Sequence, residues 1–88
     1  MVIETTAQFD KHYQKRILPN KNLTLKFAER IKMFVNDPQD PILKNHKLSG
    51  TKRTLRSFSI TGDIRVIYLQ NSPSKVIFLD VGSHNQVY

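Results

Sequence analysis

The 88-residue chain contains no cysteine and no tryptophan, and it has only three glycines and seven acidic residues. Without cysteine it can form neither a disulfide nor a thiolate zinc site. A chain this short leaves roughly 35–40% of its unfolded-state surface exposed after folding, so its core is thin. Stability must therefore come from one tight core, from an oligomer or from a bound partner. We expect a single domain over residues 1–88.

Long apolar runs are also missing. No stretch approaches the roughly 20 apolar residues that cross a bilayer. Residues 1–6 lack the basic segment and apolar run of a secretory signal. We therefore expect a cytoplasmic protein with no membrane partner.

Several catalytic motifs are absent as well. The chain has no glycine-rich phosphate loop, no GxSxG, no HExxH and no Cys/His spacing typical of zinc. Its three histidines, His12, His46 and His84, are far apart in the sequence. We therefore expect no metal and no cofactor. His12 falls in a predicted helix and is expected to be a surface or packing residue.

The charge balance is strongly basic. Fourteen Lys and Arg against seven acids give a formal net charge of +7, and the sequence pI is near 10.0. A domain above about pI 9 is typical of nucleic-acid binders. A cationic surface with no nucleic-acid role, or one that binds an acidic protein, is the alternative.

Hydrophobic periodicity predicts a strand and two helices in the first half. Residues 2–6 are short and β-branched, which favours a strand ending at a helix N-cap, Thr6. Apolar residues then recur at helical spacing over 9–17 and 23–35. The segment 18–21 separates the two helices, and Pro38 ends the second.

The second half predicts three strands, at residues 54–60, 64–69 and 75–81, separated by turn-forming residues. The last two strands are nearly continuous in apolar content, which indicates central strands covered by the helices. We therefore predict an α+β fold, β-α-α-β-β-β, with a two-helix hairpin packed on a small antiparallel sheet. The first strand is expected to join that sheet.

Residues suited to RNA chemistry gather in the second half. Metal-free RNA cleavage needs groups that move protons and cations that stabilise the charge developing on the phosphate. The same residue types also occur on basic proteins that have no catalytic role. There the aliphatic part of an Arg side chain covers the core, and the ring of a terminal Tyr packs the end of the chain against the protein. The candidates are His46, Lys47, Lys52, Arg53, Arg56, Asp63, Arg65, His84 and Tyr88.

Four segments in order resemble the RelE/ParE toxin superfamily, and the last looks like its ribonuclease branch, including YafQ-like toxins. The segments are Leu48-Ser49-Gly50, Leu55-Arg56-Ser57-Phe58-Ser59-Ile60, Asp63-Ile64-Arg65-Val66-Ile67-Tyr68 and Val81-Gly82-Ser83-His84-Asn85-Gln86-Val87-Tyr88. The resemblance implies a RelE-like toxin of a type II toxin–antitoxin pair. It also implies metal-free cleavage of mRNA in the ribosomal A site, by attack of a 2′-hydroxyl on the adjacent phosphate.

The resemblance also implies roles by position. His84 matches the histidine that transfers protons, and His46 matches a second acid/base or phosphate contact. Asp63 could orient His84 or act as a base. Arg56 and Arg65 match the arginines that bind the scissile phosphate. Tyr88 matches the aromatic residue that stacks on a base or aligns the 2′-hydroxyl. Lys47, Lys52 and Arg53 are expected to contact RNA. The implied partners are mRNA, the ribosome and a cognate antitoxin.

Two positions depart from the family pattern. A further strand histidine of YafQ-like toxins is Ser59 here, and the bulky aromatic after the turn acid is Ile64. Which residue is the acid and which the base therefore stays open. Two other functions remain: a ParE-like DNA gyrase inhibitor, whose family members generally lack the histidine-bearing tail, and a catalytically weak protein that only binds antitoxin.

Overall fold

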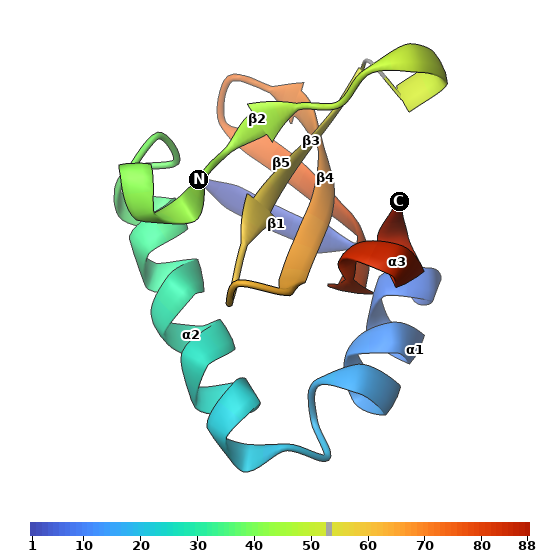
Figure 1. The fold of residues 1–88 in the computed structure, drawn as a ribbon. Helices are drawn as coiled ribbons and strands as arrows, with labels where there is room; N and C mark the ends of the chain where they lie inside the picture. The colour runs from blue at the N-terminus through green and yellow to red at the C-terminus, as the bar shows by residue number, and fades with distance from the viewer. Residues whose placement is uncertain (53) are drawn as a thin grey trace.

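The computed structural model describes residues 1–52 and 54–88. Its elements in chain order are β1 (Val2–Thr5), α1 (Ala7–Arg16), α2 (Lys21–Asn36), the 3₁₀ turn η1 (Pro41–Leu43), β2 (His46–Lys47), the 3₁₀ turn η2 (Gly50–Lys52), β3 (Leu55–Ser59), β4 (Ile64–Ser72), β5 (Lys75–Ser83) and α3 (His84–Val87). Figure 1 shows α1 and α2 diverging from their short connection, with the sheet across the open end of the pair. Over the described residues, no helix is both long and apolar enough to span a membrane.

Side-chain caps fix where the two long helices begin. Thr6 Oγ1 accepts a hydrogen bond from the Phe9 amide at 3.1 Å, which confirms the predicted N-cap. Asn20 Oδ1 does the same for the Leu23 amide at 3.0 Å. Each cap satisfies one of the amides that a helix start leaves without a partner. The connection of α1 to α2 is therefore set by local sequence.

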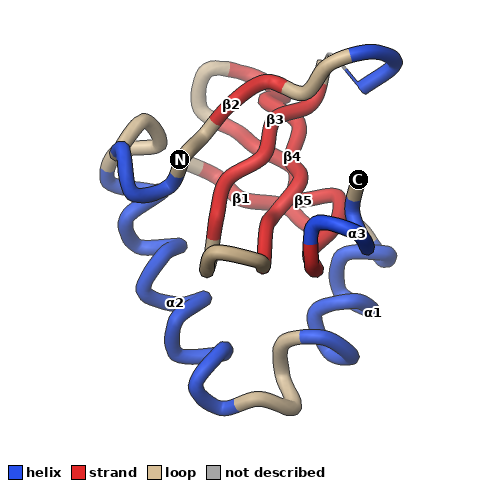
Figure 2. Tube along the Cα trace, in the orientation of Figure 1, coloured by secondary structure: helices blue, strands red, loops and turns tan. Residues whose placement is uncertain are grey.

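The strands form one five-stranded sheet with the order β1-β5-β4-β3-β2. Figure 2 shows this sheet as a compact group of strands flanked by α1 and α2. The strands β3, β4 and β5 pair in antiparallel fashion, as predicted from their short turns. One detail of the prediction was wrong: β1 lies parallel to β5, so the sheet is mixed. The two helices separate β1 from the meander, so no hairpin turn forces it to be antiparallel.

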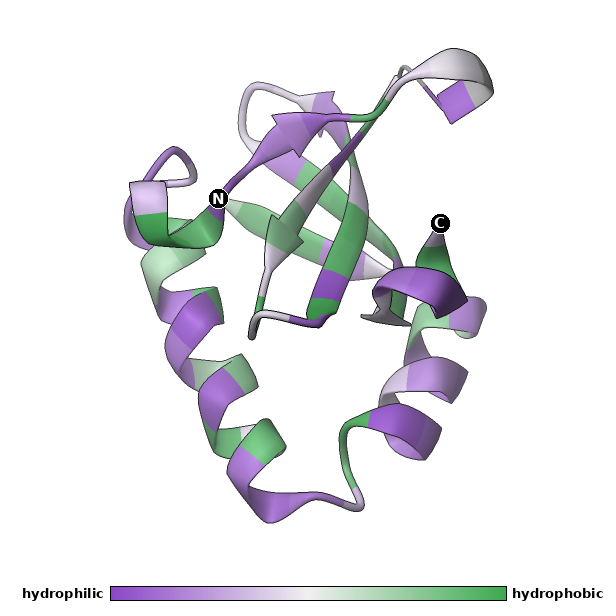
Figure 3. Ribbon diagram, in the orientation of Figure 1, coloured by the Kyte–Doolittle hydropathy of each residue, from purple (hydrophilic) through white to green (hydrophobic). Residues whose placement is uncertain are grey.

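Aromatic rings form the core between the helices and the sheet. The Phe34 ring of α2 stacks on Phe58 of β3 with centroids 4.4 Å apart, and it contacts the rings of Tyr68 and Phe78 edge-on. Phe9 brings α1 to the same cluster through Phe78. Figure 3 shows the central strands largely hydrophobic and β2 hydrophilic. Burying each ring contributes about 1.5–3 kcal/mol, so this cluster fixes the sheet that carries the candidate site.

Candidate active site

The two faces of the sheet differ in what they carry. Side chains alternate along a strand, so Phe58 faces the helices while Ser57 and Ser59 face the other way. We call this second side the outer face. His46 pairs with Ser57 in the sheet register and therefore shares the outer face. The short helix α3 covers part of this face, because Tyr88 Oη donates a hydrogen bond to Ser57 Oγ.

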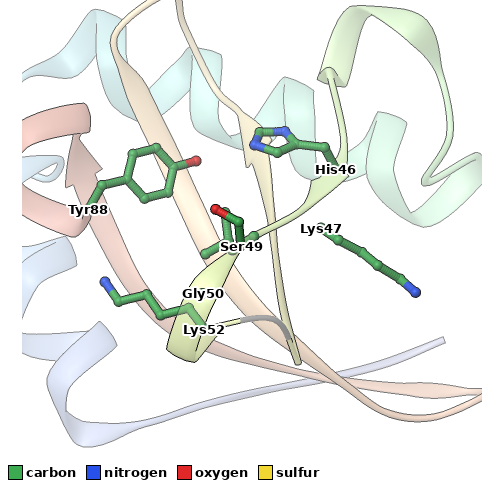
Figure 4. A pocket seen from close by; sticks show the side chains of 7 residues that line it. His46, Lys47, Ser49, Gly50, Lys52 and Tyr88 are labelled. Carbon is green, nitrogen blue, oxygen red and sulfur yellow. The ribbon is translucent and has the colours of Figure 1, made fainter.

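An open cleft of about 430 Å³ lies where the segment after β2 meets the end of α3. Its lining residues are His46, Lys47, Leu48, Ser49, Gly50, Lys52 and Tyr88. Figure 4 shows the His46 ring and the Tyr88 hydroxyl pointing toward one another across the cleft, whereas the Lys47 ammonium points away. Lys52 Nζ donates to the Val87 carbonyl at 3.3 Å. Residues as far apart in the sequence as His46 and Tyr88 thus form one site.

The His46 ring is held in a defined orientation. Its Nδ1 lies 2.9 Å from the carbonyl oxygen of Lys44. A carbonyl can only accept, so Nδ1 carries the proton and the Nε2 of the neutral ring is left as an acceptor. Such a nitrogen is suited to take a proton from a hydroxyl group.

His84 lies beside the cleft without lining it. It begins α3, and its exposed ring meets the Tyr88 ring edge-on with centroids 4.5 Å apart. The i, i+4 spacing of the two residues on a helix places them on one side. The structure therefore brings His46, Lys52, Tyr88 and His84 into one neighbourhood.

Arg65 also lies on the outer face, because it pairs with Ser59 in the register. Its Nη1 donates to Ser59 Oγ at 2.9 Å and its Nη2 to the Gly62 carbonyl at 3.4 Å. Its Nε is buried and has no hydrogen-bond partner within residues 1–52 and 54–88. Two of its guanidinium nitrogens are thus held by the turn and by β3, and the third nitrogen is left unsatisfied among the described residues.

Two of the predicted residues, Arg56 and Asp63, lie away from this group. Arg56 faces the helix side with Phe58, and its Nε donates to Asn45 Oδ1 at 3.0 Å. Asp63 is exposed in the turn between β3 and β4, and among the described residues its carboxylate makes no hydrogen bond to His84. Arg53 lies outside the described residues.

The cations of the cleft are not neutralised by acids. The ion pairs of the described residues are Lys26 with Glu29, Lys75 with Glu4, and Asp80 with both His12 and Arg16. Lys47 and Lys52, which line the cleft, take part in none of these pairs, and neither does Arg65 on the outer face. No three His, Asp or Glu side chains in the described part of the chain come close enough to hold a metal ion. The cleft thus presents uncompensated positive charge and proton-accepting groups.

The comparison with protein families decides the class of the protein. The family model described as the bacterial toxin of type II toxin–antitoxin systems, YafQ, matches residues 1–88. The chain belongs to this family. It is therefore a bacterial toxin of the type II toxin–antitoxin class.

Solved structures share the fold of this toxin. A copper-bound mutant toxin from Helicobacter pylori is 23% identical with a TM-score of 0.79, and the match covers 100% of this chain and 99% of that one. YafQ from E. coli strain BL21(DE3) is 21% identical with a TM-score of 0.77, over 98% and 96% of the two chains. The E. coli DinJ–YafQ complex matches at 20% identity with a TM-score of 0.78, over the same shares. No curated protein sequence matches the chain significantly.

The sequence did not single out two residues that organise the site. Ser57 Oγ accepts a hydrogen bond from the Tyr88 hydroxyl, and Asn45 Oδ1 accepts one from Arg56 Nε. Alternation along the predicted strands is too irregular for the sequence to place Ser57 on one face of the sheet. Nothing in the sequence alone indicated the contacts of Asn45, because they join segments that meet only in the folded chain.

Proposed function

We propose that this toxin is a metal-independent endoribonuclease that cleaves mRNA on the ribosome and thereby stops translation. The observation that carries the proposal is the cleft on the outer face, where His46, Lys52 and Tyr88 converge next to His84. Those residue types supply the proton transfer and charge stabilisation that RNA cleavage requires.

The proposed reaction is attack of a 2′-oxygen on the adjacent phosphorus. A P–O bond forms to the 2′-oxygen and the bond to the 5′-oxygen breaks, which leaves a 2′,3′-cyclic phosphate and a 5′-hydroxyl. His46 takes the 2′-hydroxyl proton at its free Nε2, and His84 delivers a proton to the leaving 5′-oxygen. Tyr88 aligns the 2′-hydroxyl and offers its ring for stacking on a base.

Positive charge stabilises the pentacoordinate phosphorane. Lys52 faces the cleft, and Arg65 carries its guanidinium on the same face of the sheet. Asp63 orients His84 when RNA is bound, because Ile64 pairs with Ser83 and residues 63 and 84 are the next positions beyond that pair. In this scheme Arg56 does not touch the phosphate, since it lies on the helix side.

The ribosome and an antitoxin are the proposed partners. The cleft is open, so we propose that the enzyme relies on the ribosome to present a single strand of mRNA. Lys52 contacts this RNA within the cleft, and Lys47 contacts it from outside the cleft. The E. coli relative YafQ has been solved in complex with DinJ. We propose that a cognate antitoxin of acidic character likewise binds this basic toxin. Both partners place its action in the bacterial cytoplasm.

The experiment that tests this function maps new 5′ ends on a reporter mRNA after controlled expression of the toxin. Three chains are compared: the wild type, His84→Ala, and His12→Ala as the matched control, because His12 pairs with Asp80 away from the cleft. A second reporter without a start codon tests dependence on translation.

We expect in-frame cuts in the translated reporter only, retained by His12→Ala and reduced about 10²–10⁴-fold by His84→Ala. Equal cleavage of the reporter without a start codon would show that the activity does not depend on the ribosome. Intact mRNA with growth arrest and DNA damage would instead indicate gyrase inhibition. No effect on growth or mRNA would indicate a protein that only binds antitoxin.

A further inference from the structure

Asn45, the residue before β2, uses its side chain to join three separate parts of the chain. Its Oδ1 accepts from Arg56 Nε at 3.0 Å. Its Nδ2 donates to the Pro38 carbonyl at 2.9 Å and to the Tyr68 hydroxyl at 2.8 Å. Tyr68 is 1% exposed and belongs to the aromatic core. Asn45 is therefore fixed to β3, to β4 and to the segment after α2.

The peptide just before Asn45 has an unusual conformation. Lys44 has φ 51° and ψ 40°, in the left-handed region that residues with a side chain rarely adopt. Such a conformation persists when the surrounding contacts hold it. The Lys44 carbonyl belongs to the peptide group between Lys44 and Asn45. The side-chain hydrogen bonds that fix Asn45 therefore also restrain this peptide group.

That same carbonyl accepts the hydrogen bond from His46 Nδ1 at 2.9 Å. A fixed carbonyl at this position determines which ring nitrogen carries the proton. It also directs the other nitrogen toward the cleft, where the ring faces Tyr88 in Figure 4.

We propose that Asn45 is a positioning residue for His46: by anchoring the Lys44–Asn45 peptide, it keeps the proton on Nδ1 and leaves Nε2 free for the substrate hydroxyl. The proposal rests on the ribonuclease function proposed above. It also gives Arg56 a role, because Arg56 contributes to the site through Asn45 and not through the phosphate.

The test measures the His46 tautomer by ¹⁵N NMR of ring-labelled protein at about pH 8.5, where free imidazole is neutral. The variants are Asn45→Ala and Tyr68→Phe, the latter removing one hydrogen bond while keeping the buried ring. Asn71→Ala is the matched control, because Asn71 is exposed near the far end of β4. His12 and His84 serve as references within each spectrum. Cleavage of the translated reporter is measured for the same variants, and thermal unfolding reports whether each is folded.

We expect His46 to carry its proton on Nδ1 in the wild type and in Asn71→Ala. In Asn45→Ala we expect a mixture of tautomers and cleavage lower by about 10-fold or more, since a histidine in the wrong tautomer cannot accept the proton. Tyr68→Phe should shift the tautomer in the same direction to a smaller extent, and it supplies the readout if Asn45→Ala does not fold.

Two results would overturn the positioning role. One is a wild-type His46 that carries its proton on Nε2, and the other is a folded variant, Asn45→Ala or Tyr68→Phe, whose tautomer and cleavage equal those of Asn71→Ala. If the tautomer shifts in the variants while even the wild type fails to cut RNA, the positioning of His46 stands and the ribonuclease function falls.

Discussion

Arg56 and Arg65 lie on neighbouring strands, yet their side chains point to opposite sides of the sheet. Arg56 shares the helix side with Phe58 and donates to Asn45. Arg65 shares the outer face with Ser59 and donates to its hydroxyl. Arg65 therefore lies on the sheet face that carries the cleft, whereas Arg56 lies on the opposite face.

The two arginines should respond differently to the same substitution. We expect Arg65→Ala to reduce single-turnover cleavage by about 10²–10³-fold, as for the loss of one group that stabilises transition-state charge. Arg56→Ala should cost about tenfold, through the tautomer of His46. Rates measured at saturating ribosome concentration separate the two, with urea unfolding to correct for stability. Equal losses for both variants would contradict this assignment of faces.

At the scale of elements, α3 depends on its surroundings. A helix of only four residues is not stable by itself. It is held because Lys52 donates to its Val87 carbonyl, and because Gln86 Oε1 accepts from the Ser83 amide at 2.8 Å. Since α3 carries His84 and leads into Tyr88, the shape of the cleft depends on how firmly this helix is docked.

Gly82, just before α3, tests that dependence. A Cβ at this position would lie 2.6 Å from Gln86 Oε1 and 2.7 Å from Arg16 Nη1. Gly82→Ala must therefore displace Gln86 from the Ser83 amide, at a cost of about 1 kcal/mol for a lost helix cap. We expect hydrogen exchange of the Tyr88 amide, which bonds to the His84 carbonyl, to accelerate about fivefold. The matched control is Gly62→Ala, where a Cβ would meet nothing within 4 Å, and faster exchange there too would point to a general loss of stability.

The elements also show how far sequence patterns reach. Apolar periodicity predicted both long helices, and the strand β4 begins at residue 64 as expected but continues to Ser72. The strand β2 and the helix α3 were not predicted, because two and four residues are too few for a period to be read. The parallel sense of β1 was missed because it depends on a contact with β5, far along the chain.

Only part of the candidate site could be predicted, because contacts between distant segments leave no local sequence pattern. Residue chemistry and the family pattern indicated His46, Lys52, His84 and Tyr88, which the fold gathers around one cleft. Residue type could not tell that Arg56 and Arg65 face opposite ways, since blurred alternation hides the sheet faces. The residues that orient others, such as Asn45, carry no signature outside the folded chain.

At the scale of the whole molecule, the proposed function requires that the net charge of +7 attract RNA. If three cations contact phosphates of a single strand, the slope of log affinity against log salt is about −2. Affinity for a short mRNA should then fall about 20-fold between roughly 50 and 200 mM salt.

Removing one cation at a time locates the contact surface. Lys52→Gln should reduce the magnitude of the salt slope by about 0.7, because Lys52 faces the cleft. Lys21→Gln removes the same charge at the exposed start of α2 and should leave the slope nearly unchanged. Fluorescence anisotropy of labelled RNA over a salt series measures both. A slope that falls equally for the two variants would mean that binding is spread over the whole surface.

The parallel pairing of β1 with β5 has a consequence for the synthesis of the toxin. On a translating ribosome β1 emerges early, but the strand that joins it to β4 is made after both. The sheet therefore stays incomplete, and the core open, until Lys75–Ser83 has left the ribosome. The helix α3, which brings His84 and Tyr88 to the cleft, follows later still. The nascent chain therefore lacks the cleft while its own ribosome is still making it. The cleft forms only after the strand that completes the sheet has emerged.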